Sequence, residues 1–446
     1  MSIKKRILSG AAVNFAGMVM SAAAQIVSVP VLTSAWGVEQ YGTWLMITTV
    51  PAYLALSDLG FASASTSDMT MQIARGQRAQ ARTTFQSVWM LVNLVSAALL
   101  LITIVVAVAL PGLSNSTLWL SAYSSVLLLL VVYSALSLNA RIALAGLRAT
   151  ENYAFGTMLN QLITLFEVSA TLTIAGLGGS FFECAVGMVC MQIANVLIMF
   201  TALHYRVGWL QVGWSNASLS EVRRLWLPAV AAMAIPIALA VNLQGMVIVA
   251  GVFVSATAAA TLASVRTVSR VAIQAVGAIN RATMPELSAA GAKDDMHAFG
   301  KIVALNLASV ALILVPGALL FGAIGDQVVE IWTRSKIHPA PSLVWLLAIS
   351  MVAHGLWYYT SNLMLASNAH TKVTRLLTTV CLGAIAAAIL AATYLGLLGI
   401  GLVLMLSEVA CLIGVLRVAF QSGLITANNL EEALTLGFWR SRRSFK

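Results

Sequence analysis

The chain has 446 residues, of which 60% are hydrophobic and only 9% are charged, and its mean hydropathy is +0.92. Soluble domains carry roughly 25% charged residues, so this composition excludes an ordinary soluble protein. The net charge is +10, but the basic residues lie at the ends of apolar segments, which indicates membrane orientation rather than nucleic-acid binding. At about 20 residues for each crossing, the length predicts an all-α integral membrane protein with about 12 transmembrane helices.

Apolar segments follow one another along the chain and are separated by short polar breaks. The predicted spans cover residues 8–35, 41–66, 84–110, 117–142, 157–177, 181–203, 226–251, 256–281, 301–324, 343–366, 376–396 and 399–420. A longer polar segment divides them into two sets of six, a duplication that is common among transporters. We therefore expect two six-helix halves around a central cavity, with this organisation: N-terminal half 1–204, cytoplasmic amphipathic connector 205–225, C-terminal half 226–420 and basic cytoplasmic tail 421–446.

Within the connector, Ser218 and Glu221 have the spacing of a capping box. This pattern predicts the start of a short helix that carries Arg223, Arg224 and Trp226 along the membrane surface.

The distribution of Lys and Arg predicts the orientation. Of the 25 such residues, only Arg334 and Lys336 fall in predicted outer loops, and Arg266 and Arg270 fall inside a span. All others lie in segments that are cytoplasmic if the N-terminus is inside, which is the bias that membrane proteins show. Both termini are therefore expected in the cytoplasm.

The N-terminal basic cluster and the apolar stretch after it have the outline of a signal peptide, with small residues at Ala22–Ala24. The apolar run continues to Ala35, however, and cleavage would leave a fragment too short to span. We expect an uncut first helix.

No residue pattern indicates a cofactor or metal. The cysteines lie inside apolar runs without Cys-x-x-Cys or Cys/His spacing, so neither a zinc site nor a disulfide framework is indicated; they are Cys184, Cys190, Cys381 and Cys411. Phosphate-binding loops and hydrolase motifs are absent from the sequence, so we expect no nucleotide-driven step and no enzyme activity.

Residues 36–61 carry the most informative motif. A first apolar segment ends at Trp36-Gly37, and Tyr41-Gly42-Thr43-Trp44 opens a second, which closes on Asp58-Leu59-Gly60. Aromatic rings at the mouth of a span suit the lipid headgroup region. Together with the following Ala74-Arg75-Gly76 loop, this pattern resembles the Wzx-type O-antigen and polysaccharide flippases of the multidrug/oligosaccharidyl-lipid/polysaccharide exporter superfamily. The resemblance is sharp over residues 1–90 and architectural over the rest.

The resemblance implies an alternating-access flippase in the bacterial cytoplasmic (inner) membrane. Such a protein moves a polyprenyl-pyrophosphate-linked oligosaccharide to the outer leaflet for O-antigen, lipopolysaccharide or other surface-polysaccharide biosynthesis. The implied partners are the lipid-linked oligosaccharide, membrane lipids, H⁺ or Na⁺, and proteins of polysaccharide assembly.

Five formal charges fall inside predicted spans, where each costs about 2.5–3.5 kcal/mol. They are Asp58, Glu167, Arg266, Arg270 and Glu408. Arg266 and Arg270 are four residues apart and so share one helix face. Two guanidinium forks on one face suit the phosphate oxygens of a pyrophosphate. The alternative, which does not exclude the first, is a buried ion pair with one of the three acids.

The acids Asp58, Glu167 and Glu408 are candidates for proton or cation coupling, because a carboxyl group in a low-dielectric cavity titrates closer to neutral pH. For Asp58, the alternative is a helix cap or interhelical hydrogen bond near Leu59-Gly60. For Glu167 and Glu408, it is a pairing with the arginines. His354 is the histidine placed well inside a span, and we expect it to pack or hydrogen-bond within the bundle.

Two other functions fit parts of the sequence. A multidrug or cation antiporter of the same superfamily also needs buried acids, but cavity arginines disfavour cationic drugs. A membrane-embedded glycan polymerase or ligase needs a large outer loop, and the longest one predicted here is only 325–341.

Overall fold

The structure is a computed structural model that describes residues 3–56, 60–113, 123–292, 296–366 and 371–423. The described residues form helices joined by short connections, with no strand among them: α1 (Ile3–Leu54), α2 (Phe61–Ala74), α3 (Arg78–Leu113), α5 (Ser124–Ala149), α6 (Tyr153–Gly176), α7 (Phe181–Arg206), α8 (Leu219–Phe253), α9 (Ala256–Ala292), α10 (Met296–Trp332), α11 (Pro341–Ala366) and α12 (Thr371–Gln421). The chain forms two compact units, Met1–Ala240 and Val241–Lys446, which we name unit 1 and unit 2.

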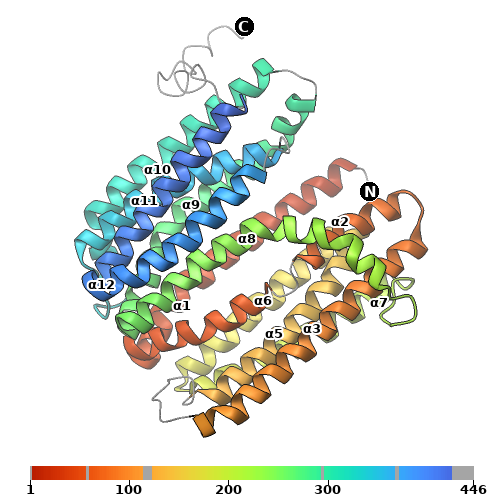
Figure 1. Cartoon of the computed structure of the whole chain (residues 1–446), viewed down its shortest axis with the longest axis horizontal. Helices are drawn as coiled ribbons and strands as arrows, with labels where there is room; N and C mark the ends of the chain where they lie inside the picture. Colours follow the sequence, from red (N-terminus) through yellow and green to blue (C-terminus); the bar gives the residue numbers. More distant parts are fainter. Residues whose placement is uncertain (1–2, 57–59, 114–122, 293–295, 367–370, 424–446) are drawn as a thin grey trace. The chain divides into compact units, whose positions relative to one another are not determined.

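The helices have the length and composition of membrane spans. Among the described residues, eight are long and apolar enough to cross a membrane. Two of these spans are far longer than one crossing needs, with 43 residues in Ala12–Leu54 and 49 in Val373–Gln421. Each contains one glycine with non-helical backbone angles, Gly37 in α1 and Gly396 in α12. Figure 1 shows both helices reversing direction partway along their length, as expected where two predicted spans meet.

Unit 1 is built around α5, which contacts α1, α2, α3, α6 and α7. Its buried side chains include Leu138, Ile142 and Leu147, each no more than 1% exposed. Gly146 allows close helix packing, because a Cβ atom there would lie 3.0 Å from the side chains of both Leu203 and Leu210. Small residues at such crossings let membrane helices approach closely.

Unit 2 is built around α11, which contacts α9, α10 and α12. Val344 and Tyr359 on α11 are buried, with 0% and 1% exposed. Gly355 accommodates a side chain of α10, because a Cβ atom there would lie only 2.3 Å from Leu314. The two units thus each have one central helix that contacts most of its neighbours.

Three glycines of the sequence motif lie at changes of chain direction. Gly37, Gly60 and Gly76 have φ values of +80°, +79° and +77°, in the region that favours glycine. Gly60 precedes α2 and is also tightly packed, because a Cβ atom there would lie 2.5 Å from the Ala229 carbonyl oxygen and 2.3 Å from Met233. The motif therefore marks turns that only glycine adopts without strain.

Two local expectations differ from the structure. Tyr41 and Trp44 are 4% and 5% exposed, so their rings are covered by other protein groups rather than facing the surroundings. The reason for Trp44 is a partner distant in sequence, Phe181, whose ring centroid is 5.3 Å away. The helix that begins at Leu219 is also not short, because α8 continues as one helix through Phe253.

Candidate functional site

Glu408 is the more buried of the two predicted coupling acids that the structure describes, with 6% exposed. It lies on α12, and one carboxylate oxygen, Oε2, faces two side chains of α11. The Nδ1 atom of His354 is 3.0 Å from Oε2, and the indole Nε1 of Trp357 donates a 2.5 Å hydrogen bond to it. His354 and Trp357 are three residues apart, so they share one face of α11. One oxygen of the carboxylate is therefore satisfied by α11, and His354 hydrogen-bonds within the bundle as expected.

Arg266 and Arg270 lie on α9 in unit 2, and both side chains are half-buried. The Nη1 atom of Arg266 donates to the Leu243 carbonyl oxygen (3.3 Å) and Nη2 to Asn242 Oδ1 (3.4 Å). Arg270 makes no hydrogen bond or ion pair with another described residue. The two guanidinium groups thus retain several free N–H donors.

Arg266, Arg270 and Glu408 lie near one another in unit 2, but neither arginine forms an ion pair with a described residue. Arg266 interacts electrostatically with both Arg270 and Glu408. Among the described residues, however, no carboxylate lies within ion-pair distance of either arginine, and the ion-pair partner of Glu408 is His354. The negative charge of Glu408 thus partly offsets the repulsion between the two arginines without a direct contact.

Glu167 lies on α6 in unit 1 and has a different environment. The hydroxyl of Tyr133 on α5 donates a 2.7 Å hydrogen bond to its Oε1. With the Gln192 amide oriented to satisfy both of its atoms, the nitrogen donates to Glu167 Oε2 (3.3 Å) and the oxygen accepts from Asn195 Nδ2 (3.2 Å). Gln192 and Asn195 lie on α7, so the acid is held by neutral groups from two neighbouring helices.

Of the five residues predicted from the sequence, the structure brings together Arg266, Arg270 and Glu408 in unit 2 and places Glu167 in unit 1. Asp58 lies outside the described residues. Neither Tyr133 nor Trp357 was predicted. Each has an aromatic side chain with one polar hydrogen, which normally needs a hydrogen-bond partner when it is buried. The sequence contains no other feature that would have pointed to these two residues.

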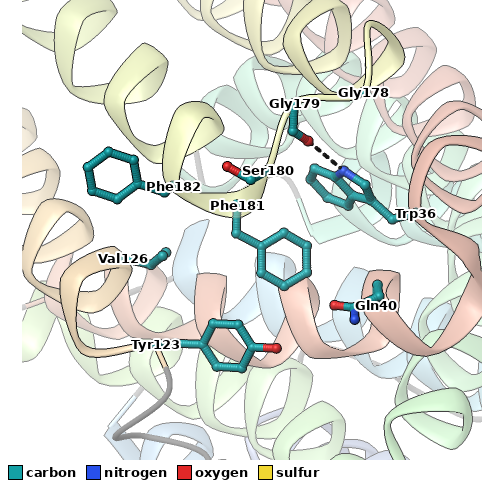
Figure 2. Close-up of a pocket in the computed structure, with 9 residues that line it drawn as sticks. All are labelled: Trp36, Gln40, Tyr123, Val126, Gly178, Gly179, Ser180, Phe181 and Phe182. Carbon is teal, nitrogen blue, oxygen red and sulfur yellow. Dashed lines mark hydrogen bonds between the residues drawn. The ribbon is translucent and has the colours of Figure 1, made fainter.

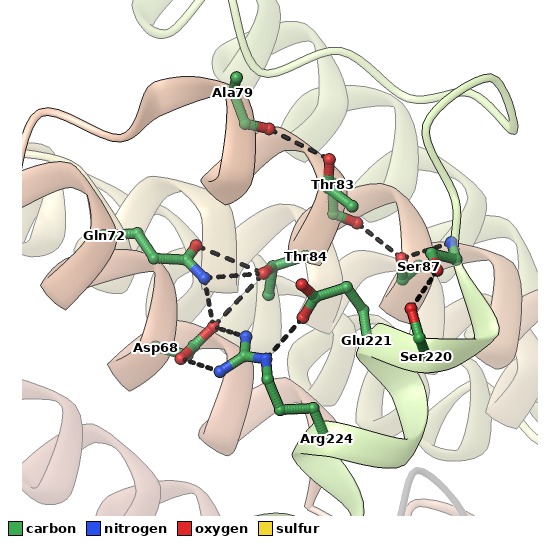
Figure 3. Close-up of polar contacts among 10 residues, drawn as sticks. Asp68, Gln72, Ala79, Thr83, Thr84, Ser87, Ser220, Glu221 and Arg224 are labelled. Carbon is green, nitrogen blue, oxygen red and sulfur yellow. Dashed lines mark hydrogen bonds and ion pairs between the residues drawn. The ribbon is translucent and has the colours of Figure 1, made fainter.

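A second polar cluster was not predicted at all (Figure 3). Arg224, near the start of α8, donates to both carboxylate oxygens of Asp68 on α2, at 2.9 and 2.5 Å. Its Nε also donates to Glu221 at 2.8 Å. The hydrogen bonds to Asp68 raise the pKa of the Arg224 guanidinium above its ordinary value. Gln72 donates to the same carboxylate at 2.7 Å, so this cluster fixes the start of α8 to α2.

The connector before α8 is held on α3 by further contacts. The Gln86 amide donates to the Gln211 carbonyl oxygen at 3.0 Å, and its oxygen accepts from the Asn216 backbone N–H at 2.9 Å. Trp214 packs edge-on against Trp89. These contacts dock the connector, which the sequence predicts to be cytoplasmic, onto α3 of unit 1.

Comparisons with known proteins agree with the helical architecture. No model of a protein family matches the sequence, and no curated protein matches it. Solved structures do match.

One match is the inward-facing conformation of a multidrug resistance MATE family transporter of the MOP superfamily, with TM-score 0.69 and 15% identity, covering 92% of this chain and 94% of that one. A second is the lipid II flippase MurJ in an inward closed conformation, with TM-score 0.69 and 12% identity, covering 98% and 93%. A third is a mutant of the Vibrio cholerae MATE transporter VcmN, with TM-score 0.61 and 15% identity, covering 94% and 96%. At these identities the likeness shows the fold: a multi-pass membrane protein with the architecture shared by MATE transporters and MurJ.

Proposed function

We propose that this chain is an alternating-access flippase that moves a polyprenyl-pyrophosphate-linked oligosaccharide across the bacterial cytoplasmic membrane for O-antigen or other surface-polysaccharide biosynthesis. The proposal includes 12 spans in two halves, both termini in the cytoplasm, and coupling to H⁺ or Na⁺. The Wzx-type motif and the fold shared with a lipid II flippase support it.

One observation carries the choice of substrate. Arg266 and Arg270 lie one turn apart on α9, which the sequence predicts to be a span, and no described carboxylate neutralises them by direct contact. Taking a cation even partly out of water without a counter-ion is costly, so the pair is best explained by a ligand that brings negative charge. Pyrophosphate offers oxygens on two phosphate groups, which suits two guanidinium forks.

The test is translocation of a polyprenyl-pyrophosphate-linked oligosaccharide in proteoliposomes, read by access of a lectin to the glycan on each side. We expect Arg266→Ala/Arg270→Ala to lose translocation and Arg266→Lys/Arg270→Lys to retain only part of it, because lysine keeps the charge but loses the fork. Arg223→Ala/Arg417→Ala is the matched control, since both of these arginines are exposed. If the first double variant is folded and as active as the parent, the arginines do not bind substrate.

The fold likeness to MATE transporters favours a second candidate, a multidrug or cation antiporter. The same proteoliposomes distinguish it. Export of a cationic dye against a proton or sodium gradient, without glycan translocation, would replace the flippase proposal.

A further inference from the structure

A separate cavity of about 430 Å³ lies at one end of unit 1. Figure 2 shows the residues that line it, which come from three connections: Trp36 and Gln40 beside the break in α1, Tyr123 and Val126 at the start of α5, and residues 178–182 between α6 and α7. The sequence assigns all three connections to the outer side of the membrane. The cavity is thus at the end of unit 1 opposite the predicted cytoplasmic segments.

The aromatic wall of this cavity is fixed in place. The Trp36 indole donates a 2.8 Å hydrogen bond to the Gly179 carbonyl oxygen. The Phe181 ring packs 4.8 Å from Trp36 and 5.7 Å from Tyr123, measured between centroids. The chain before Phe181 is held by a capping box, in which Ser180 and Glu183 exchange hydrogen bonds. Such a pre-formed wall lowers the entropic cost of binding.

The polar groups of the cavity are few and uncharged. The Gln40 amide and the Tyr123 hydroxyl make no hydrogen bond with another described residue, and Figure 2 shows both side chains beside the Phe181 ring. An amide supplies donors and an acceptor together, and a phenol supplies one of each. No side chain that lines the cavity carries a charge.

This chemistry selects a neutral ligand with one apolar face and several hydroxyls. Among the lining side chains an anion finds no cation and a cationic headgroup finds no carboxylate, and the nearby Glu183 is engaged by Ser180. An acyl chain leaves the Gln40 amide unused. A pyranose ring fits, since its C–H face packs on aromatic rings while its hydroxyls pair with the amide and phenol.

We propose that this cavity binds one neutral sugar residue on the outer side of the membrane. Its role as a receiving site for the glycan rests on the proposed function, whereas sugar binding itself does not. Cavities of this size with an apolar wall and a few polar groups are typical of small-ligand sites.

The test uses the full chain in lipid nanodiscs and neutral methyl glycosides of common hexoses, with saturation-transfer NMR to detect weak binding. We expect saturation transfer to at least one glycoside. Gln40→Leu and Tyr123→Phe should each raise its dissociation constant about fivefold, the usual effect of one lost hydrogen bond. Gln25→Leu is the matched control, because Gln25 is also exposed but lines a different cavity.

Absence of transfer to every glycoside, or equal binding by Gln40→Leu and the parent, overturns the proposal. Transfer to choline but to no glycoside would assign the cavity to a cationic headgroup and also overturn it. The proposed function can fail separately. If the chain binds glycosides but does not translocate the glycan in proteoliposomes, the sugar site is supported and the flippase function is contradicted.

Discussion

The two units each hold a carboxylate among their helices, and the surroundings of the two differ. Glu408 in unit 2 is 6% exposed and faces His354 and Trp357 on one neighbouring helix. Glu167 in unit 1 is half-buried and faces Tyr133 and the Gln192 amide. The first acid is sealed by its partners, whereas the second remains partly accessible.

The neighbouring charges differ as well. Glu408 interacts electrostatically with Arg266, so positive charge is already close to it. The hydrogen-bonding partners of Glu167 among the described residues are neutral. A cation that binds Glu408 must therefore compete with the positive charge of Arg266. The hydrogen-bonding partners of Glu167 carry no such charge. We expect Glu167 to serve coupling and Glu408 to hold the arginine-bearing unit together.

The strongest test of this contrast is the removal of each acid. We expect Glu408→Ala to lower the free energy of unfolding by about 3 kcal/mol, because it leaves the buried Trp357 and the half-buried His354 without their shared partner. Glu167→Ala should cost less, because that acid is only half-buried. In a Cys190→Ser background, which removes the exposed cysteine, a thiol-reactive dye in detergent can follow unfolding of both units, since Cys184 in unit 1 and Cys381 in unit 2 are buried. Equal losses of unfolding free energy in the two variants would show that Glu408 and Glu167 do not differ in their structural role.

The next test compares the helix breaks of the two units, which lie at Gly37 in α1 and at Gly396 in α12. Gly37→Ala and Gly396→Ala should each cost about 1–3 kcal/mol, because both glycines adopt positive φ while open space surrounds them. The matched controls are Gly176→Ala and Gly383→Ala, which meet open space at helical positions and should be neutral or stabilising. The same unfolding assay applies, and a neutral result at Gly37 or Gly396 would show that the break is not strained.

A functional test separates the two acids. Glu167→Gln should reduce the stimulation of translocation by an ion gradient about 5–150-fold, the usual range for coupling between two sites. Glu408→Gln should preserve most of the stimulation, because its amide oxygen still accepts from Trp357. Translocation in proteoliposomes with and without an imposed H⁺ or Na⁺ gradient measures both. The opposite pattern would assign coupling to unit 2.

The smallest expected effect concerns one hydroxyl. Tyr133→Phe should lower the free energy of unfolding by about 1 kcal/mol, because Glu167 loses one hydrogen bond. Tyr358→Phe is the control, since Tyr358 is also half-buried but its hydroxyl makes no hydrogen bond with another described residue. A similar loss in both variants would mean that the Tyr133 contact contributes nothing specific.

The sequence was sufficient for the helical membrane architecture and for the break at Gly37, because composition, apolar length and glycine position are local properties. It also placed Arg266 and Arg270 on one face, since helical period alone decides this. The sequence could not predict the hydrogen-bonding partners of Glu167 and Glu408. Tyr133 is 34 residues from Glu167, and His354 is 54 from Glu408.

Such pairs depend on which helices pack together and at what rotation, and no local pattern fixes either. The burial of Trp44 was missed for the same reason, because its contact with Phe181 joins two distant connections. Asp68 and Arg224 are 156 residues apart, and each alone has the pattern of an ordinary surface charge.

The indole N–H of Trp357 is bound directly to the Glu408 carboxylate. In an NMR spectrum of the ¹⁵N-labelled chain, the 11 tryptophans give separate indole signals. The one belonging to Trp357 should lie apart from the rest and move whenever the charge on its acceptor changes. The protein thus carries its own spectroscopic reporter, which lets the ionisation of Glu408 be followed in the intact chain without an added probe.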